Sequence, residues 1–252
     1  VGRLRHVDDE ERVDFLASVL RHPSPPAEGR LSVRERRLLT MLCLSLWDRE
    51  KRFASLDEAL VRLWEHGAIR GEIAQLVEYL GEQATQVTLD GGLGPDVSLR
   101  VHERYTRTEV LAALGESTIA APKPSREGVY FARSIPADVL FVTLQKTLDR
   151  FSPTTMYHDY AVSPTRFHWE SQSTTAAASP TGQRYIHHRA HGPDVLLFVR
   201  ETQDSPSGGR MPFLFLGKAE YAGHRGERPM QIVWQLAHAM PADFFQAARA
   251  VA

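Results

Sequence analysis

Apolar residues in the first half of the chain recur at the spacing of an α-helix. After the acidic run at residues 8–11, Val13, Leu16, Val19 and Leu20 fall on one helical face. Three capping boxes precede further apolar runs; in each, a hydroxyl accepts from an orphan N–H of the first turn and a carboxylate reaches back. The boxes are Ser32–Glu35, which opens the run to Trp47, Ser55–Glu58 and Thr106–Glu109. This pattern predicts a helical region.

Glycines indicate where these helices end. Gly67 and Gly115 are placed to end the second and third capped helices, while Gly71 interrupts the apolar pattern of residues 69–80. The stretch LDGGLGPDVS at residues 89–98 holds three glycines and a proline, which predicts a loop.

The second half of the chain has a different period. Its apolar runs are short, rich in Val, Ile, Phe and Tyr, and separated by turn signals such as Ser152-Pro153 and Gly192-Pro193. The runs are Val129–Ala132, Val139–Leu144, Val195–Val199, Phe213–Leu216 and Ile232–Leu236. We expect an α+β protein, with a helical connector subdomain at residues 1–121 and a mainly antiparallel, barrel-like β domain at residues 122–252. The two prolines of residues 121–128 suggest a linker between them.

Composition narrows the class of protein. A chain of 252 residues with 42% hydrophobic and 24% charged residues is typical of a globular protein. No apolar run approaches the roughly 20 residues that span a bilayer. The single cysteine, Cys43, excludes an internal disulfide and favours a reducing, cytoplasmic setting. The chain does not begin with Met, so we expect a piece of a longer protein.

The charge is divided unevenly along the chain. Residues 1–121 carry 16 Lys and Arg against 20 Asp and Glu, whereas residues 122–252 carry 14 against 11 and seven of the eleven histidines. This mild basic bias permits a nucleic-acid partner for the second half without requiring one.

The sequence lacks the motifs of familiar enzymes. There is no phosphate-binding GxxxxGK[ST] loop, no GxGxxG, no HExxH and no GxSxG. His187 and His188 would point to opposite faces of a strand, so with His191 they do not favour a metal site, and we expect none. His158 and His168 flank Asp159, which would suit acid–base chemistry, but no nucleophile accompanies them. We expect a chain without catalytic residues.

One stretch, YHDYAVSPTRFHWESQSTT at residues 157–175, combines aromatic rings with amide, carboxylate and hydroxyl groups. A pocket for a nucleobase needs both stacking faces and hydrogen-bonding groups. In a strand, Phe167 and Trp169 would share one face and His168 and Gln172 the other, so the two aromatic residues are equally open to a packing role. The candidate base-pocket residues are Tyr157, Asp159, Tyr160, His168, Trp169, Ser171 and Gln172.

Phosphate contacts would come from cations near that stretch. Those available are Lys146, Arg150, Arg166, Arg184, Arg189, Lys218, Arg225 and Arg228. Several must cluster, because the phosphate contribution to affinity scales with the number of contacts. We expect Arg166, Arg184 and Lys218 to bind phosphate groups.

Several segments together resemble a known arrangement of domains. The segments FSPTTMYHDYAVSPTRFHWESQSTT, TGQRYIHH, DVLLFVRE, PFLFLGKAEY and RPMQIVWQLAHAMP resemble the C-terminal domain of SauUSI-like type IV restriction enzymes. The upstream segments HVDDEERVDFL, LWEHGAIRGEIAQLVEYL and LRVHERYTRTEVLAALG resemble the helical segment that precedes it. In those enzymes the domain follows a phospholipase-D-type nuclease and an ATP-dependent helicase, and it is compared with SRA-type readers of modified cytosine.

The resemblance implies a non-catalytic module that reads 5-methylcytosine or 5-hydroxymethylcytosine in double-stranded DNA. Helicase and nuclease domains would be its partners in the parent chain, and ATP and a divalent metal would be cofactors of that parent rather than of this chain. Three alternatives stay open: a reader of another modification such as phosphorothioate, a structural module that forms a homodimer, and a hydrolase centred on His168 and Asp159. No membrane partner is expected.

Overall fold

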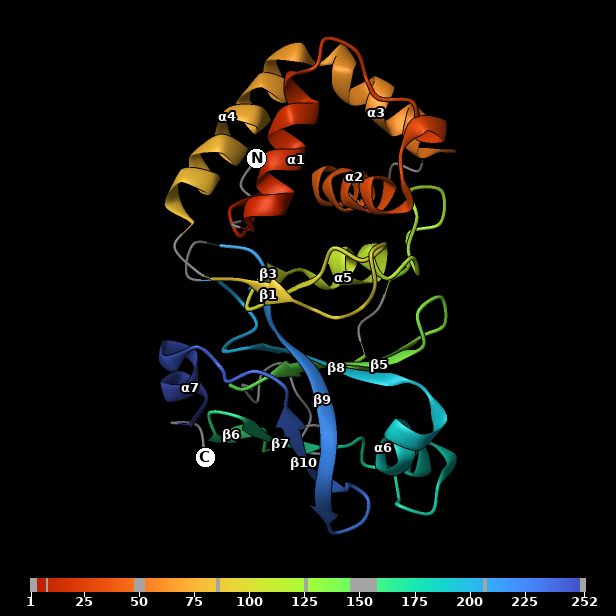
Figure 1. Ribbon diagram of the computed structural model, residues 1–252, viewed down its shortest axis with the longest axis vertical. Helices are drawn as coiled ribbons and strands as arrows, with labels where there is room; N and C mark the ends of the chain where they lie inside the picture. Colours follow the sequence, from red (N-terminus) through yellow and green to blue (C-terminus); the bar gives the residue numbers. More distant parts are fainter. Residues whose placement is uncertain are drawn as a thin grey trace. The chain divides into compact units, whose positions relative to one another are not determined.

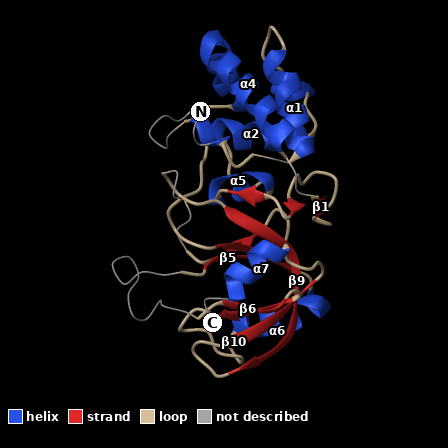
Figure 2. Cartoon of the chain, turned by 90° about the vertical axis from the view of Figure 1, so that its left-hand side faces the viewer, coloured by secondary structure: helices blue, strands red, loops and turns tan. Residues whose placement is uncertain are grey.

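The computed structural model describes residues 4–7, 9–47, 53–84, 87–124, 127–145, 158–205 and 208–249. The chain divides into two compact units, drawn in Figure 1. The helical unit comprises residues 1–126 and 132–135, and the sheet unit comprises residues 127–131 and 136–252. Helices dominate the first and a large, mainly antiparallel sheet the second, which confirms the α+β class (Figure 2).

The helical unit packs its helices around a continuous apolar core. Leu16, Leu39, Leu60 and Ile73, from four different helices, are all fully buried there. Gly71 does not interrupt its helix, because α4 runs through it. The elements are α1 (Glu10–Arg21), η2 (Glu28–Arg30), α2 (Val33–Leu46), α3 (Leu56–Glu65), α4 (Gly67–Gln83), β1 (Leu89–Asp90), β2 (Arg100–Val101), β3 (Arg104–Tyr105) and α5 (Arg107–Ala113).

Two of the three expected capping boxes form completely, at Ser32 of α2 and Thr106 of α5. At α3 only half of the box forms. The Glu58 backbone N–H donates to Ser55 Oγ at 3.2 Å, but the Glu58 carboxylate accepts from the Ala54 N–H at 2.6 Å instead of reaching Ser55. The Glu58 carboxylate still accepts from a backbone N–H beside the helix start. The sequence pattern therefore identifies Ser55 as the N-cap correctly, but the carboxylate bonds one residue earlier than expected.

Glu109 does more than cap α5. Its fully buried carboxylate accepts hydrogen bonds from Arg12 and from His6, at 2.7 Å in the second case, and Ser45 Oγ lies 3.3 Å away. Burial alone would raise the pKa of Glu109, but Arg12 and His6 hold it well below its usual range. An ion pair therefore joins α1 to α5 inside the helical unit.

The sheet unit is built on one sheet with strand order β4-β5-β8-β9-β10-β7-β6. Neighbouring strands β8-β9, β9-β10, β10-β7 and β7-β6 are antiparallel, and β5-β8 is parallel. Two helices accompany it, and α7 contacts β6 while α6 contacts β9. The elements are β4 (Val129–Ala132), β5 (Ala137–Thr143), β6 (Tyr160–Ser163), β7 (Arg166–Glu170), α6 (Pro180–His191), β8 (Asp194–Arg200), β9 (Phe213–Arg225), β10 (Gln231–Leu236) and α7 (Ala242–Arg249).

The sheet is open, so the expected barrel-like closure is wrong. In the described part of the chain β4 and β6 stand at opposite ends of the strand order and do not pair with each other. Alternating apolar runs specify strands and their buried faces, but closure depends on strand tilt and stagger, which such runs do not encode.

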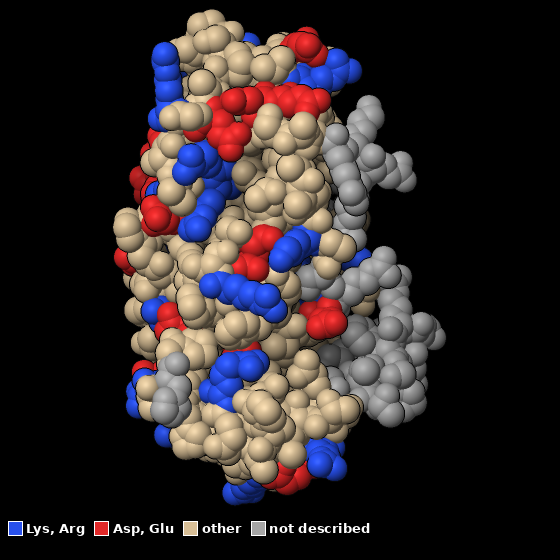
Figure 3. Space-filling model, turned by 90° about the vertical axis from the view of Figure 1, so that its right-hand side faces the viewer, with Lys and Arg blue, Asp and Glu red and all other residues tan. Residues whose placement is uncertain are grey.

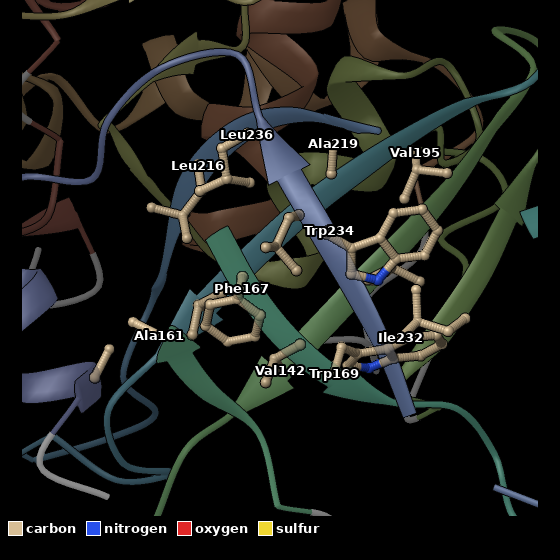
Figure 4. Packing of buried hydrophobic residues seen from close by; sticks show 14 of the residues in the cluster. Val142, Ala161, Phe167, Trp169, Val195, Leu216, Ala219, Ile232, Trp234 and Leu236 are labelled. Atoms are coloured by element: carbon tan, nitrogen blue, oxygen red, sulfur yellow. The ribbon is translucent and has the colours of Figure 1, made fainter. Parts of the chain in front are cut away.

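Both faces of the central strands are buried, and in β5 every residue is buried. On one face, Leu140 and Val142 join a core that includes Phe167, Trp169 and Trp234 (Figure 4). On the other, the rings of Phe198 and Phe215 stack with centroids 4.4 Å apart. Phe167 and Trp169 are 0% and 5% exposed, which confirms the packing role considered for them.

Residues 180–191 form helix α6, not a strand. The helix begins at an N-cap, Ser179, whose Oγ accepts from the Gly182 N–H, and Pro180 occupies its first turn. The expectation that His187 and His188 point to opposite faces of a strand is therefore wrong, because both lie in α6, which is kinked at His187. No group of three metal-ligating side chains gathers among the described residues. Nor does any helix in these residues have the length and apolar character to cross a membrane.

Candidate nucleic-acid interface

Strands β6, β7, β10 and β9 turn one side toward the apolar core and the other away from it. In the register of the sheet, His168 lies between Tyr160 and Val233, and Arg166 lies opposite Gln235. Their neighbours Phe167, Trp169, Ile232 and Trp234 point into the core, as Figure 4 shows. We call the side away from the core the outer face; by this register its residues include Tyr160, Arg166, His168, Glu170, Glu220, Arg225, Gln231, Val233 and Gln235.

The centre of the outer face is a stacked pair of rings. Tyr160 and His168 lie parallel, with centroids 4.5 Å apart and an interplanar angle of 16°. His168 Nδ1 lies 2.8 Å from the carbonyl oxygen of His158. Because a carbonyl only accepts, Nδ1 carries the proton, and the neutral ring then presents Nε2 as an acceptor. The pair offers an aromatic surface with one directed polar atom.

Amide and guanidinium groups lie beside this pair. Arg166 Nε donates to Gln235 Oε1 at 3.2 Å, and Gln235 Nε2 donates to the Thr165 carbonyl at 3.0 Å. Gln231 Nε2 donates to Glu170 Oε1 at 3.2 Å. These bonds orient the side chains on the outer face, where amides and a guanidinium are suited to hydrogen bonding with base edges or phosphates.

Two buried carboxylates, Asp159 and Glu170, tie the residues that precede β6 to the end of β7. Asp159 is 4% exposed, and its Oδ1 accepts from the Glu170 backbone N–H at 3.0 Å. Glu170 Oε2 in turn accepts from the His158 N–H at 3.2 Å. Asp159 therefore fixes the chain that carries His168, and its predicted contact with a base stays a prediction.

The remaining base-pocket candidates are spread over different surroundings. Trp169 lies in the core against Tyr185 and Trp234, with ring centroids 5.6 and 6.2 Å away. Ser171 is fully buried; its Oγ accepts from the Met230 N–H at 2.9 Å. Gln172 is half-buried, and its Oε1 accepts from Thr175 Oγ1 at 3.4 Å. Tyr157 lies outside the described residues. The structure thus unites Tyr160 and His168 and separates them from Trp169.

Two of the three expected phosphate ligands are held in ion pairs. Arg184 donates from Nε and Nη2 to the buried carboxylate of Asp138, at 2.7 and 2.9 Å. Lys218 Nζ lies 2.8 Å from Asp194 Oδ2. Arg166 is exposed on the outer face. A role in phosphate binding for these three residues stays a prediction.

The sequence contained a signal for the amides that we did not use. In RPMQIVWQL the polar residues Gln231 and Gln235 alternate with Ile232, Trp234 and Leu236, which are all buried. Alternation of this kind assigns Gln231, Val233 and Gln235 to the face away from the core.

The helical unit holds a hollow of about 750 Å³ beside α1 and α4. Its lining includes the acidic residues Glu10, Asp14, Glu78 and Glu82 and the basic residues Arg21 and Arg100. The excess of carboxylates would repel phosphate, so this hollow does not suit nucleic acid.

Comparisons with other proteins place the chain in a family. Two crystal structures of Arabidopsis thaliana SUVH6 in complex with SAM are similar, with TM-scores of 0.36 and 0.35 and identities of 11% and 10%. The alignments cover 94% and 96% of this chain but only 40% of the SUVH6 chain, and likeness at this level is too slight to carry an argument. No curated protein matches the sequence. The family described as "Domain of unknown function (DUF3427)" matches residues 99–248, more than half of the chain, and the protein therefore belongs to the DUF3427 family.

Proposed function

We propose that this chain is a DNA-binding module that reads modified cytosine in duplex DNA through the outer face of its sheet. The observation that carries the proposal is the stacked pair of Tyr160 and His168, set among Arg166, Gln231 and Gln235 on a face turned away from the core. The resemblance to the C-terminal domain of SauUSI-like enzymes supports the same conclusion. Its most specific segment contains both Tyr160 and His168.

The chemistry of the outer face suits a cytosine base edge. In the major groove cytosine presents its N4 amine as a donor. His168 Nε2, in the neutral ring, is an acceptor for that amine. Tyr160 and Val233 flank His168 in the register and offer apolar contact to a 5-methyl group.

The contact area of one methyl group sets the size of the expected effect. Burying a methyl group is worth on the order of 1 kcal/mol, which corresponds to roughly five- to tenfold in affinity. We therefore expect one module to discriminate only modestly between modified and unmodified cytosine. A parent protein would gain further selectivity for modified DNA from later steps.

The test is binding of the 252-residue chain to one duplex in three forms, with cytosine, 5-methylcytosine or 5-hydroxymethylcytosine at a single position. We expect roughly five- to tenfold tighter binding of a modified form at physiological salt, and loss of that ratio in Val233→Ala, whereas His168→Ala should weaken the binding of all three duplexes. The matched control is His66→Ala, an exposed histidine in the helical unit. Equal affinity for all three duplexes overturns the proposal, and preference for a phosphorothioate duplex would assign the module to another mark.

We also propose that the chain has no catalytic activity of its own. The histidine of the hydrolase alternative, His168, bonds through Nδ1 to the His158 carbonyl, and in the described part of the chain it has no hydrogen bond to a hydroxyl or thiol that it could activate. Duplex DNA incubated with the chain and Mg²⁺ should stay intact, and cleavage abolished by His168→Ala would contradict this.

A further inference from the structure

The turn between β9 and β10 lies against the loop that follows β7. The Arg228 N–H donates to the Thr175 carbonyl at 3.2 Å, and the Met230 N–H donates to Ser171 Oγ at 2.9 Å. The Ser171 N–H donates back to the Met230 carbonyl at 2.9 Å. Two segments more than fifty residues apart are thus tied into one rigid surface beside the outer face. We call residues 171–175 and 225–230 the turn surface.

Two arginines of the turn surface are exposed. Arg225 ends β9 and belongs to the outer face, and Arg228 lies within the turn. Neither guanidinium forms an ion pair with any residue that the structure describes. The acid between them, Glu227, accepts from the Ala177 N–H at 2.8 Å, so its carboxylate is turned to the backbone of the adjoining loop.

Three other cations of the sheet unit already form ion pairs. Arg184, Arg189 and Lys218 each hold a carboxylate, in Asp138, Glu220 and Asp194. A cation that already holds an anion must release it before it binds phosphate, whereas Arg225 and Arg228 have no such cost. On the side of the molecule in Figure 3, basic and acidic side chains are interspersed, so affinity for a polyanion there depends on individual unpaired cations.

The backbone of Arg228 is a second, independent observation. Its φ of 57° lies in the left-handed region, which disfavours side chains other than glycine and is often found at functional sites. Glycine would adopt this conformation more easily. An arginine at such a position costs stability, and a contact made by its guanidinium would offset that cost.

We propose that Arg225 and Arg228 bind the phosphate backbone of DNA, and that the turn surface positions the duplex for the outer face. This inference rests on the proposed function, because it supplies the phosphate contacts which that function needs. It assigns these contacts to two arginines rather than to Arg184 and Lys218.

The experiment measures the salt dependence of DNA binding by the whole chain. Each phosphate contact contributes about 0.9 to the slope of log affinity against log salt, so Arg225→Ala/Arg228→Gly should lower the slope by about 2 and the affinity by about tenfold or more. The ratio of affinities for modified and unmodified duplex should stay at its wild-type value, since phosphates carry no sequence information. Arg225→Lys/Arg228→Lys should restore the slope.

The control is Arg21→Ala/Arg62→Ala, which removes the same charge from exposed ion pairs in the helical unit. A second readout separates binding from folding: Arg228→Gly should raise the Tm while it weakens DNA binding. A wild-type slope in Arg225→Ala/Arg228→Gly overturns the inference. A reduced slope in a chain that binds all three duplexes equally supports it and overturns only the proposed reading of modified cytosine.

Discussion

Arg184 holds Asp138 through two parallel hydrogen bonds, at 2.7 and 2.9 Å, while the Asp138 carboxylate is fully buried. Arg184 also lies over the ring of Phe131, 4.9 Å from its centroid. A bidentate pair of this kind neutralises the negative charge of Asp138, which is buried inside the sheet unit. Arg184 therefore has a structural partner as well as an exposed side.

Removal of Arg184 should destabilise the protein. Arg184→Ala leaves Asp138 buried without its cation, so we expect the free energy of unfolding to fall by about 3 kcal/mol in a urea titration. DNA affinity, corrected for the folded fraction, should change less than twofold. Arg189→Ala, at an exposed pair with Glu220, should leave the urea midpoint unchanged. A loss of affinity without loss of stability would instead support the phosphate role expected from the sequence.

Asp9 should make stability depend on pH. It caps α1 but is 3% exposed, and burial, opposed by Arg12, raises its pKa to about 6. Since the folded pKa lies above the unfolded value of 3.8, its contribution is favourable below pH 3.8 and is lost as the pH rises through 6. Asp9→Asn keeps the cap, so it should stabilise the protein at pH 7 by on the order of 2 kcal/mol. Urea titrations should show this gain shrinking toward pH 4; a gain that is constant across pH would contradict the assignment.

Two glycines in helices should respond oppositely to alanine. A Cβ on Gly182, in the first turn of α6, would lie 2.1 Å from the Ala176 carbonyl oxygen, so Gly182→Ala must move backbone and should cost about 2 kcal/mol or more. A Cβ on Gly71 of α4 meets nothing within 4 Å, and Gly71→Ala should stabilise by about 0.5–1 kcal/mol. Thermal unfolding of both variants checks the prediction, which fails if they shift the Tm in the same direction.

Trp169 should act through packing. Trp169→Phe keeps an aromatic ring against Tyr185 and Trp234 but leaves space in the core, so we expect a loss of about 1–2 kcal/mol in a urea titration. The affinity of the folded protein for modified DNA should not change. If it falls at equal folded fraction, Trp169 contacts the base as the sequence suggested.

The sequence was sufficient for elements defined by local patterns. Hydroxyl and carboxylate spacing located the starts of α2, α3 and α5, and alternation located the core side of β7 through Phe167 and Trp169. It did not reveal α6, whose sequence PTGQRYIHHRAH has no clear apolar stripe; only Ser179 before the helix and Pro180 at its first position indicated a helix start.

The candidate site could be predicted only in part, because it depends on contacts distant in sequence. Tyr160 and His168 were found as residue types, but their stacking requires the register of β6 against β7. Nothing in the sequence indicated that Arg184 would meet Asp138, or that Arg228 would bond to Thr175. Which cations are paired is decided by tertiary structure, so the choice among eight Lys and Arg residues could not be made from spacing.

The partners of Glu109 bear on how the family should be delimited. The DUF3427 match begins at residue 99 and includes Glu109, whereas His6, Arg12 and Ser45 precede that residue. A polypeptide cut at residue 99 would keep the Glu109 carboxylate and lose Arg12 and His6, together with α2, which contacts α5. The first residue of the family match is therefore not the first residue of a folded unit. A fragment intended to fold should start upstream of Leu4, which is buried in the helical unit.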